Sequence, residues 1–335
     1  MEHLTESLSV SIIIPTFNGA TRIVRCLESL CEQTAGRQVE ILVVDDGSND
    51  DIAEVVGRFS GVRLISQANA GPATARNHGA REARGDVILF TDDDCEPAPG
   101  WLDAMLQPFT DPEVVGVKGA YRTRQRPLMA RFVQAEYEDR YRLMAHISNI
   151  DFIDTYSAAF RRERFVEMGG YDTQFPVACA EDVELSYRMS AKGWQMRFAP
   201  KAIVYHQHPD SLGRYLKKKF KFAFWRVLAV RKNPSKAVKD SHTPQLMKLQ
   251  LLFGPAALAG LALDMYFRPA VPISAIALGL FLISTIPFTL RSAARDPAVG
   301  VISPMVLAAR SCSQLFGILA GVLKARNSQV ARTHS

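Results

Sequence analysis

The fold is decided by the stretch DVILFTDDD (residues 86–94), in which a short apolar run leads directly into three carboxylates. Its β-branched and aromatic side chains predict a buried strand. Three similar runs precede it, SVSIIIP (9–15), VEILVVDD (39–46) and a shorter one at 62–65. Apolar residues at helical spacing fall between these runs, at 21–30, 52–59 and 72–84. Strands that alternate with helices predict an α/β domain with a mostly parallel sheet covered on both faces.

Polar clusters follow three of these predicted strands. They are Pro15-Thr16-Phe17-Asn18, Asp45-Asp46 and Asp92-Asp93-Asp94. Ligands of parallel α/β sheets bind at the carboxyl ends of the strands. In an extended chain the carboxylates of Asp92 and Asp94 would point to the same side, and such oxygen ligands suit Mg²⁺ or Mn²⁺ bridging to phosphates. The residues therefore predict a site for a divalent cation and a phosphorylated ligand, although acidic triplets also occur in solvated turns.

The composition fits a folded protein of one large or two medium domains, with 335 residues, 47% hydrophobic and 22% charged. Its five cysteines include no CxxC pair, which argues against a disulfide scaffold and a cysteine zinc module. The first ten residues lack the pattern of a signal peptide, so none is expected. No GxGxxG motif follows the first predicted strand, which excludes a dinucleotide oxidoreductase.

The C-terminal third is apolar enough to enter a membrane. Residues 269–290 carry no charge over 22 residues, long enough to cross a bilayer about 30 Å thick. A weaker run at 246–267 precedes them, and a third at 297–323 is interrupted by Arg310. We therefore expect a membrane region with two to three hydrophobic helices. Three complete crossings could not place all the flanking basic residues on the cytoplasmic face, so two spans plus a re-entrant or interfacial segment fit better.

A basic segment lies immediately before these apolar runs. Residues 201–248 carry twelve Lys and Arg against two Asp, a net charge of +10, whereas the whole chain carries +6. Aromatic residues are interspersed with lysines over 211–232, a composition suited to a lipid headgroup layer. Nucleic acid is the other partner such a patch could bind. The neighbouring apolar runs favour membrane lipids, and no nucleic acid is expected.

Five motifs occur in order along the chain: SIIIPTFN (11–18), VVDDGSND (43–50), NAGPATARNHG (69–79), DVILFTDDD (86–94) and MGGYDTQFPVACAEDVELSYRMSAKGW (168–194). Together they closely resemble the family 2 glycosyltransferases, which are inverting enzymes with the GT-A fold, over about residues 11–210. The resemblance implies a Rossmann-like GT-A catalytic domain at 1–210, followed by a basic aromatic interfacial segment at 211–245 and the membrane region at 246–335. It also implies a nucleotide diphosphate-sugar donor and a divalent cation, Mn²⁺ or Mg²⁺.

The resemblance implies which residues bind the nucleotide sugar. They are Pro15, Thr16, Asn18, Asp45, Asp46, Asn69, Gly71, Arg76, Asp92, Asp93 and Arg188. Asp45 or Asp46 would accept a hydrogen bond from the base, although Asp46-Gly47-Ser48 also suits a turn in which Ser48 or Asp50 caps the next helix. Gly71-Pro72 begins a helix whose N–H groups favour anions. Arg76 would reach the base or a phosphate, or would form a surface ion pair.

The acidic triplet matches the DxD motif of the family. The resemblance implies that Asp94 is the principal metal ligand, with Asp92 at the ribose or the metal and Asp93 in support. His206 stands where many GT-A enzymes carry a further metal ligand, although a lone His is more often structural.

Glu181-Asp182 matches the family's ED motif, whose second acid is the catalytic base. Asp182 would take the proton of the acceptor hydroxyl, with Glu181 orienting Asp182 or the acceptor. The same acids would also suit the start of a helix. Arg188, on the predicted helix, would touch the diphosphate or face water.

The expected protein is a metal-dependent, hexosyltransferase-type glycosyltransferase of the cell membrane, multi-pass, with its catalytic domain on the cytoplasmic face. Its acceptor would be a lipid-linked or otherwise membrane-presented molecule or a glycan, and the enzyme would act in the synthesis of cell-envelope polysaccharide or glycolipid. The chain lacks the QxxRW motif of processive synthases and carries a GGYD…ED segment absent from the dolichol-phosphate-mannose-like subgroup. The alternative is a catalytically silent nucleotide-binding membrane scaffold, against which the intact Asp92, Asp94 and Asp182 argue.

Overall fold

The computed structural model describes residues 8–175, 180–234, 241, 243–267 and 272–333, with side chains up to residue 325. Part of the fifth motif, residues 176–179 with Cys179, lies outside the described residues. The chain divides into two compact units. The first contains residues 1–124 and 144–207, and the second contains 125–143 and 208–335.

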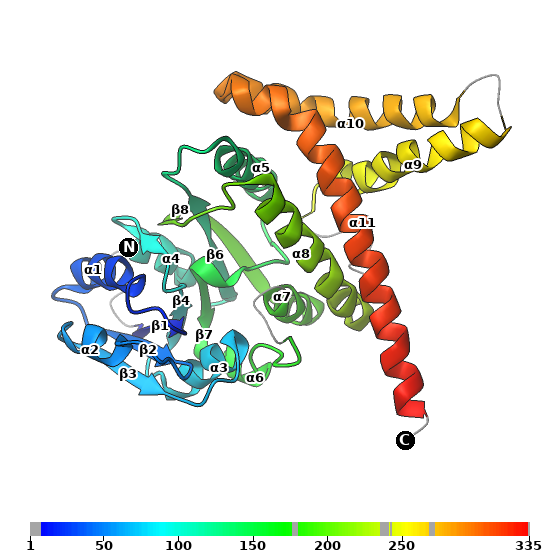
Figure 1. The fold of residues 1–335 in the computed structure, drawn as a ribbon. Helices are drawn as coiled ribbons and strands as arrows, with labels where there is room; N and C mark the ends of the chain where they lie inside the picture. Colours follow the sequence, from blue (N-terminus) through cyan, green and yellow to red (C-terminus); the bar gives the residue numbers. More distant parts are fainter. Residues whose placement is uncertain (1–7, 176–179, 235–240, 242, 268–271, 334–335) are drawn as a thin grey trace. The chain divides into compact units, whose positions relative to one another are not determined.

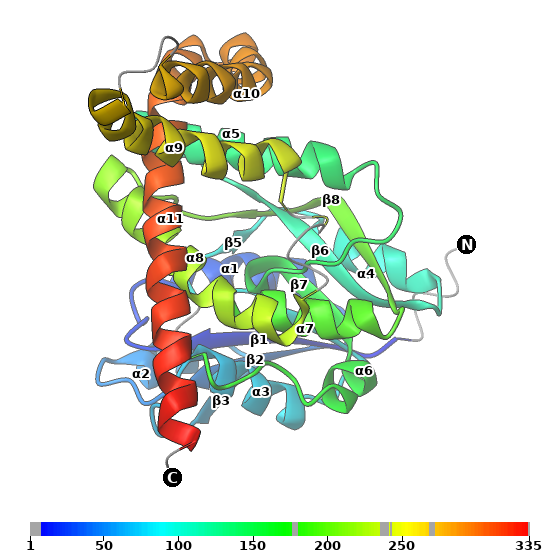
Figure 2. The same cartoon turned by 90° about the vertical axis from the view of Figure 1, so that its right-hand side faces the viewer.

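The first unit is built on an eight-stranded sheet with the order β3-β2-β1-β4-β7-β6-β8-β5 (Figures 1 and 2). The strands are β1 (Val10–Thr16), β2 (Val39–Asp45), β3 (Val62–Ser66), β4 (Val87–Phe90), β5 (Glu96–Pro97), β6 (Val114–Arg122), β7 (Ala158–Arg161) and β8 (Gln195–Tyr205). Strands β3, β2, β1 and β4 are parallel neighbours, as are β6 and β8. Strand β7 runs antiparallel to β4 and β6, and β5 runs antiparallel to β8. The predicted mostly parallel sheet is confirmed.

Helices cover both faces of the central strands. Successive residues of a strand point to opposite faces, and Ile12, Ile13 and Ile14 are all fully buried. A Cβ on Gly79 would lie 2.5 Å from Ile13 Cγ2, so the glycine lets its helix approach this face closely. The helices of this unit are α1 (Ile23–Thr34), α2 (Ile52–Gly57), α3 (Pro72–Glu82), α4 (Trp101–Leu106), α6 (Arg162–Glu167), α7 (Glu181–Ala191) and the short 3₁₀ turns at Gln107–Thr110 and Thr155–Ser157.

The register brings the carboxyl ends of β1, β2 and β4 to one edge of the sheet. Thr16 at the end of β1 lies opposite Asp45 at the end of β2. Ile13 lies opposite Phe90, and the N–H of Thr91 donates to the Ile13 carbonyl at 3.3 Å. The chain that leaves β4 therefore continues beside the last residues of β1, where the polar clusters predicted from the sequence meet.

The second unit is helical. It contains α5 (Leu128–Met144), α8 (Leu212–Lys232), α9 (Gln245–Phe267), α10 (Ile273–Arg295) and α11 (Pro297–Thr333). Its buried core includes Phe132 and Val133 of α5, Tyr215 of α8, and Phe281 and Phe288 of α10. Helix α5 lies within the sequence 1–210 predicted as the catalytic domain, yet it belongs to this unit. Its apolar side chains fill the helical core, which a reading of consecutive segments does not reveal.

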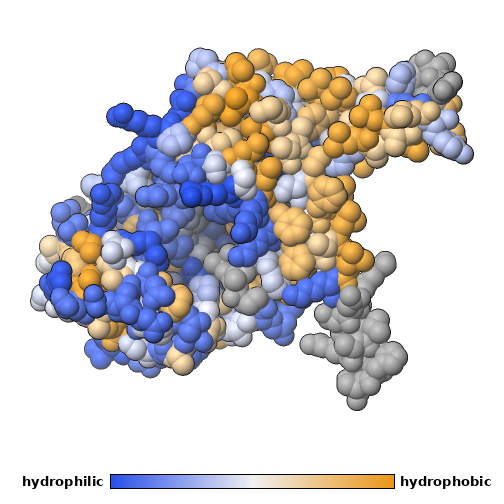
Figure 3. Space-filling model, viewed as in Figure 1, coloured by the Kyte–Doolittle hydropathy of each residue, from blue (hydrophilic) through white to orange (hydrophobic). Residues whose placement is uncertain are grey.

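Three helices of this unit are long and apolar enough to cross a membrane. They comprise Gln245–Phe267, Ile273–Arg295 and Pro297–Ala325. Helices α9 and α10 form an antiparallel hairpin, because Gln250 Nε2 donates to the Ser284 carbonyl at 3.0 Å near one end and Gly260 lies against Ser274 near the other. Figure 3 shows hydrophobic side chains gathered over the outer surfaces of α9, α10 and α11.

Candidate active site

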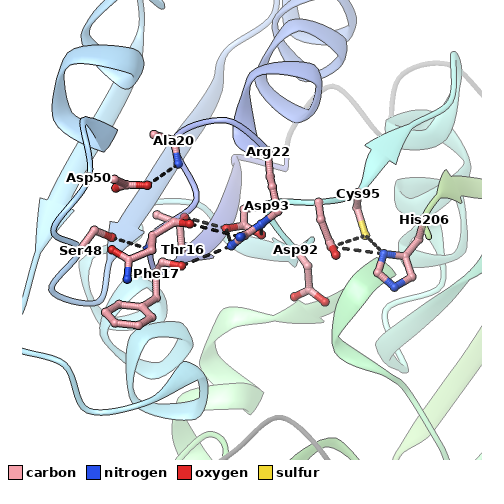
Figure 4. Close-up of polar contacts among 12 residues, drawn as sticks. Thr16, Phe17, Ala20, Arg22, Ser48, Asp50, Asp92, Asp93, Cys95 and His206 are labelled. Carbon is pink, nitrogen blue, oxygen red and sulfur yellow. Dashed lines mark hydrogen bonds and ion pairs between the residues drawn. The ribbon is translucent and has the colours of Figure 1, made fainter. Parts of the chain in front are cut away.

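The acidic triplet lies in a turn beyond β4 (Figure 4), and each carboxylate has a different partner. The N–H of Cys95 donates to the Asp92 carbonyl at 3.1 Å, so the backbone turns over these residues. The expectation that Asp92 and Asp94 point to the same side of an extended chain is therefore wrong. Asp92 Oδ1 lies 2.6 Å from a nitrogen of Arg76, and Asp94 Oδ1 lies 3.2 Å from Nδ1 of His206.

The middle carboxylate, Asp93, fastens β1 to this turn. Thr16 Oγ1 donates to Asp93 Oδ2 at 2.7 Å, and Arg22 Nη2 lies 2.9 Å from the same oxygen. A Cβ on Gly19 would lie 2.2 Å from the Asp93 carboxylate, so glycine leaves room for this contact. Burial raises the pKa of Asp93, and the Arg22 and Thr16 hydrogen bonds only partly oppose that effect. Asp93 is thus a buried structural anchor at the site.

The loop after β1 and the turn after β2 are joined by reciprocal hydrogen bonds. The N–H of Asn18 donates to Ser48 Oγ at 2.9 Å, and Asn18 Oδ1 accepts from the N–H of Asn49 at 2.9 Å. Asn18 has a φ of +49°, in the left-handed region that Asn tolerates better than most residues. Contrary to expectation, Ser48 and Asp50 do not cap α2. Ser48 Oγ accepts a hydrogen bond from the Asn18 N–H, and Asp50 Oδ2 accepts one from the Ala20 N–H at 2.9 Å.

Asp46 shapes the neighbouring loop that leads into α3. Its two carboxylate oxygens accept from the N–H groups of Ala70 and Gly71 at 2.9 and 2.8 Å. Gly71 has a φ of +89°, which favours glycine, and it directly precedes the Pro that begins α3. Asn69 lies against the turn after β2, because its backbone nitrogen is 2.8 Å from the position that a Cβ on Gly47 would take. The structure thus brings the first three motifs together.

Arg76 joins the fourth motif to the fifth. Its side chain is 2% exposed and lies 2.6 Å from Asp92 Oδ1 and 3.3 Å from Glu181 Oε1. Burial would lower the pKa of this guanidinium, but the Asp92 and Glu181 carboxylates outweigh burial and raise that pKa above its usual value. Among the described residues, its Nε has no hydrogen-bond partner. Arg76 is therefore an internal cation of the site and forms no surface ion pair.

Glu181 and Asp182 form the first turn of α7. Glu181 is buried, and its second oxygen accepts from the Ala180 N–H at 3.1 Å. Asp182 is half-buried, and its Oδ1 accepts from the Val183 N–H at 2.7 Å. Burial and the neighbouring carboxylates of Glu181 and Asp154 raise the pKa of Asp182 well above its usual value. A carboxylate with a raised pKa is a better proton acceptor, which suits a general base.

A second buried ion pair lies beside the first turn of α7. Lys118 Nζ pairs with Asp154 and donates to the hydroxyl of Tyr156 at 2.8 Å. Ser186 Oγ connects this segment to the helix, accepting from the Ile153 N–H at 3.0 Å and donating to the Asp182 carbonyl at 2.7 Å. The sequence does not reveal this pair, because one lysine inside a strand and one acid inside a loop carry no local signal.

Asp94, Cys95 and His206 form the cluster at the other end of the turn. One ligand atom from each lies within 4.8 Å of the others. Burial would raise the pKa of Asp94, but the hydrogen bond and charge of His206 outweigh burial and lower that pKa. Burial and nearby acids raise the pKa of the Cys95 thiol well above its usual value, so it stays protonated and is a poor ligand. Carboxylate oxygen and imidazole nitrogen fit Mn²⁺ well, so the residues present suit the predicted cation.

Arg188 lies on α7, but its contacts are with the glycine turn before that helix. Its Nε donates to Glu184 at 2.8 Å, and its Nη2 donates to the Gly170 carbonyl at 2.7 Å. Gly170 has a φ of +70° and abuts Asn77, whose Oδ1 accepts from the Tyr171 N–H at 2.8 Å. The structure does not join Arg188 to the acidic triplet, and its contact with a diphosphate stays a prediction.

Comparisons with known proteins find similarity to glycosyltransferases. The model of the family described as "Glycosyl transferase family 2" matches residues 11–168. Pre-mycofactocin glycosyltransferase of Mycobacterium tuberculosis is 28% identical over 228 residues, covering 63% of this chain and 45% of that protein. Glycosyltransferase AglE of Haloferax volcanii is 28% identical over 225 residues, covering 63% of this chain and 71% of that protein. The chain spans about half the length of several curated relatives it matches.

The fold is also found among solved structures. A mannosyltransferase from Pyrobaculum calidifontis, in complex with GDP-Man and Mn²⁺, superimposes with a TM-score of 0.58 at 20% sequence identity. The match covers 94% of this chain and 87% of the other. The likeness therefore extends beyond the first unit into the C-terminal helices.

Proposed function

Residues 11–168 belong to glycosyltransferase family 2, and from this premise we propose that the chain is a membrane-attached, inverting glycosyltransferase. It transfers a sugar from a nucleoside diphosphate donor to a hydroxyl group of a lipid-linked or otherwise membrane-presented acceptor. One observation carries the proposal: Arg76 bridges Asp92 and Glu181, so the two acidic motifs, far apart in sequence, belong to a single site.

The donor lies along the edge formed by the ends of β1 and β2 and the start of α3. Thr16 and Asn18 line one wall, and Asp45 and Asp46 shape the adjoining turn. Phe17 is 45% exposed in this loop and offers an aromatic face to a base. Pro15, Asn69 and Gly71 complete the edge. Arg76 remains charged under all physiological conditions and attracts the diphosphate.

Asp94 and His206 would hold the divalent cation, and Asp92 would contact the ribose or the same ion. A cation bound there would supply positive charge to offset the charge of the leaving diphosphate. Asp93 contributes by fixing the turn, because its carboxylate is committed to Thr16 and Arg22.

Asp182 acts as the general base. It accepts the proton of the acceptor hydroxyl while that oxygen attacks the anomeric carbon from the side opposite the diphosphate, which inverts the configuration. Glu181 positions Arg76 by its buried ion pair and completes the first turn of α7. The C-terminal helices place the enzyme at the membrane, with its catalytic unit on the cytoplasmic face, where nucleotide sugars are available.

The proposal is tested by thermal unfolding of the detergent-solubilised full chain with UDP, GDP, CDP or dTDP and their sugars, each with and without Mn²⁺. A ligand at 100 times its dissociation constant adds about 2.7 kcal/mol to the free energy of unfolding. We expect one nucleotide to stabilise the chain only with Mn²⁺, and Asp94→Ala to abolish that effect. Asp103→Ala, an exposed acid of the same unit, is the matched control. Stabilisation by none of the nucleotides would contradict the proposed donor site.

A further inference from the structure

We propose that only the hairpin of α9 and α10 crosses the bilayer, whereas α11 lies along the membrane surface beside α8 and returns the C-terminus to the face from which α9 enters. The surface that α8 and α11 form together contacts a bilayer with anionic headgroups. The inference rests on the membrane attachment in the proposed function, and is independent of the donor, the acceptor and the catalytic residues.

Helix α8 cannot lie in hydrocarbon. Over Leu212–Lys232 it carries eight Lys or Arg and no acid. A charged side chain at the centre of a bilayer is strongly unfavourable, so eight of them exclude insertion. Arg214, Lys217 and Lys221 are exposed and lie at the helical spacing of a single face. Phe220 and Phe222 are exposed beside them, which gives the mixed basic and aromatic composition of a helix in a headgroup layer.

Helix α11 follows α8 in parallel along most of this length. Ser313 Oγ donates to the Leu216 carbonyl at 2.8 Å. One turn on, a Cβ on Gly317 would lie 2.4 Å from the Phe220 carbonyl oxygen. The small residues repeat every four positions, since Gly321 lies in the same way against Phe224, and such a stripe lets two helices approach closely. A helix that follows a charged surface helix turn by turn cannot itself cross the bilayer.

The first half of α11 is also bound to polar groups. Arg310 is 5% exposed at its side chain, and its Nη1 donates to Glu136 of α5 at 2.6 Å. The same carboxylate pairs with Lys219 of α8 at 2.9 Å and accepts from the Tyr215 hydroxyl at 2.9 Å. Burial would raise the pKa of Glu136, but Lys219 and Arg310 outweigh burial and lower that pKa, so the group stays ionised. The charge that interrupts the third apolar run therefore marks a junction with α5 and α8.

The turn between α10 and α11 is also tied to polar groups of α5. Arg291 and Arg295 at the end of α10 pair with Asp139 and Glu138 of α5, at 2.7 and 2.6 Å. Asp296 pairs with Arg131 of α5 at 2.7 Å. Helix α5 thus forms four ion pairs with α10, α11 and the turn between them, which sets this end of the hairpin at the polar surface.

The hairpin itself has the dimensions and exposure of a membrane insert. Each helix has 23 residues, about 35 Å at 1.5 Å per residue, enough for a hydrocarbon core of about 30 Å. At the far end Asp264 receives the N–H groups of Ile273 and Ser274 at 2.7 and 2.9 Å, and Tyr266 is 81% exposed nearby. A carboxylate and an aromatic ring suit the opposite headgroup layer.

The outer face of α11 is apolar, as a surface helix requires. Its exposed large side chains are Val301, Met305, Phe316, Leu319 and Leu323. Their spacing fits one side of a helix. Figure 3 shows hydrophobic surface along α11. Such a helix lies in the membrane plane with this side toward the acyl chains.

Cysteine labelling in oriented membrane vesicles tests the topology. Single cysteines are introduced as Asp103→Cys, as Tyr266→Cys and as an extra residue at the C-terminus, in a full chain without native cysteines that keeps the parent's thermal transition. A membrane-impermeant maleimide is expected to label position 103 and the C-terminus from the same face, and position 266 from the opposite face. Labelling of the C-terminus from the opposite face to position 103 would establish three spans and overturn the proposal. Labelling of all three from one face would overturn it by showing that the hairpin does not cross.

A matched pair of glycine variants tests the contact between α8 and α11. Gly317→Leu would force a side chain against the α8 backbone, whereas Gly279→Leu on α10 enters open space. We expect the first variant, in native membranes, to lower the unfolding temperature and the second to leave it unchanged. Equal unfolding temperatures would contradict the packing of α11 on α8. Failure of the donor site would leave both experiments unaffected, so the two proposals fail separately.

Discussion

Replacing Arg76 by Met should destabilise the first unit strongly, because it leaves a buried carboxylate without its cation. The Glu181 side chain is 2% exposed, and Arg76 is 3.3 Å from it. Removal of one partner from a buried ion pair typically costs about 3–5 kcal/mol. Asp92, at 28% exposed, can turn to water and contributes less. For a unit of this size each kcal/mol lowers the unfolding temperature by about 2–4 °C, so the expected loss is roughly 6–20 °C.

The assay is thermal unfolding in detergent, followed for Arg76→Met, Glu181→Gln and the double variant. In the double variant no charge is left unpaired at position 181, so we expect it to be more stable than the sum of the single effects predicts, by about 1–3 kcal/mol. The control is Arg63→Met, which removes a cation 37% exposed and paired with Glu40 and Glu82, and should cost under about 1 kcal/mol. A loss for Arg76→Met as small as that of the control, or strict additivity in the double variant, would refute the reasoning.

Three further predictions concern catalysis. Asp182→Asn should reduce sugar transfer by at least about 100-fold while leaving donor affinity nearly intact, because a base acts in the transition state; unchanged turnover would remove Asp182 from the mechanism. Burial, Glu181 and Asp154 raise the pKa of Asp182, so kcat/KM should fall on acidification at a pH above the usual carboxyl pKa of about 3.9. The double variant Lys118→Met/Asp154→Asn removes the Asp154 charge, so its kcat/KM should fall only at a lower pH. His206→Ala should weaken Mn²⁺-dependent donor binding, measured by titration with and without the metal, whereas metal-independent binding in both proteins would contradict its role as a ligand.

The first four strands were predictable, because apolar runs that end in polar clusters are typical of buried strands, whereas the order of the strands in the sheet was not predicted. The cluster 86–94 illustrates the limit. Its apolar half forms β4 as expected, but the strand ends at Phe90 and the acids lie in a turn. Backbone direction past a strand end depends on tertiary partners such as Arg22 and Arg76, which the local sequence does not contain. The sequence reveals the three acids but not the directions in which their side chains point.

The role of single polar residues was predictable only where a motif surrounded them. Arg22 follows the first motif with no local sign that it would hold Asp93 at 2.9 Å. Glu136 and Arg310 lie far apart in the chain and pair at 2.6 Å. The sequence shows a charge inside an apolar run, but its partner lies on α5, 174 positions away in the chain, and only the packing of α5 with the C-terminal helices brings the two together.

The three consecutive acids of the site differ in role because their partners differ in kind. Asp93 faces a hydroxyl and a guanidinium inside the protein, so it is fixed by the fold. Asp92 shares Arg76 with Glu181, so it is part of the link between the two acidic motifs. Asp94 meets an imidazole, a group that can ligate a cation with it. A turn that separates neighbouring carboxylates in this way lets one short segment anchor the fold through Asp93, pair with the buried Arg76 through Asp92, and place Asp94 beside an imidazole at the same edge of the sheet.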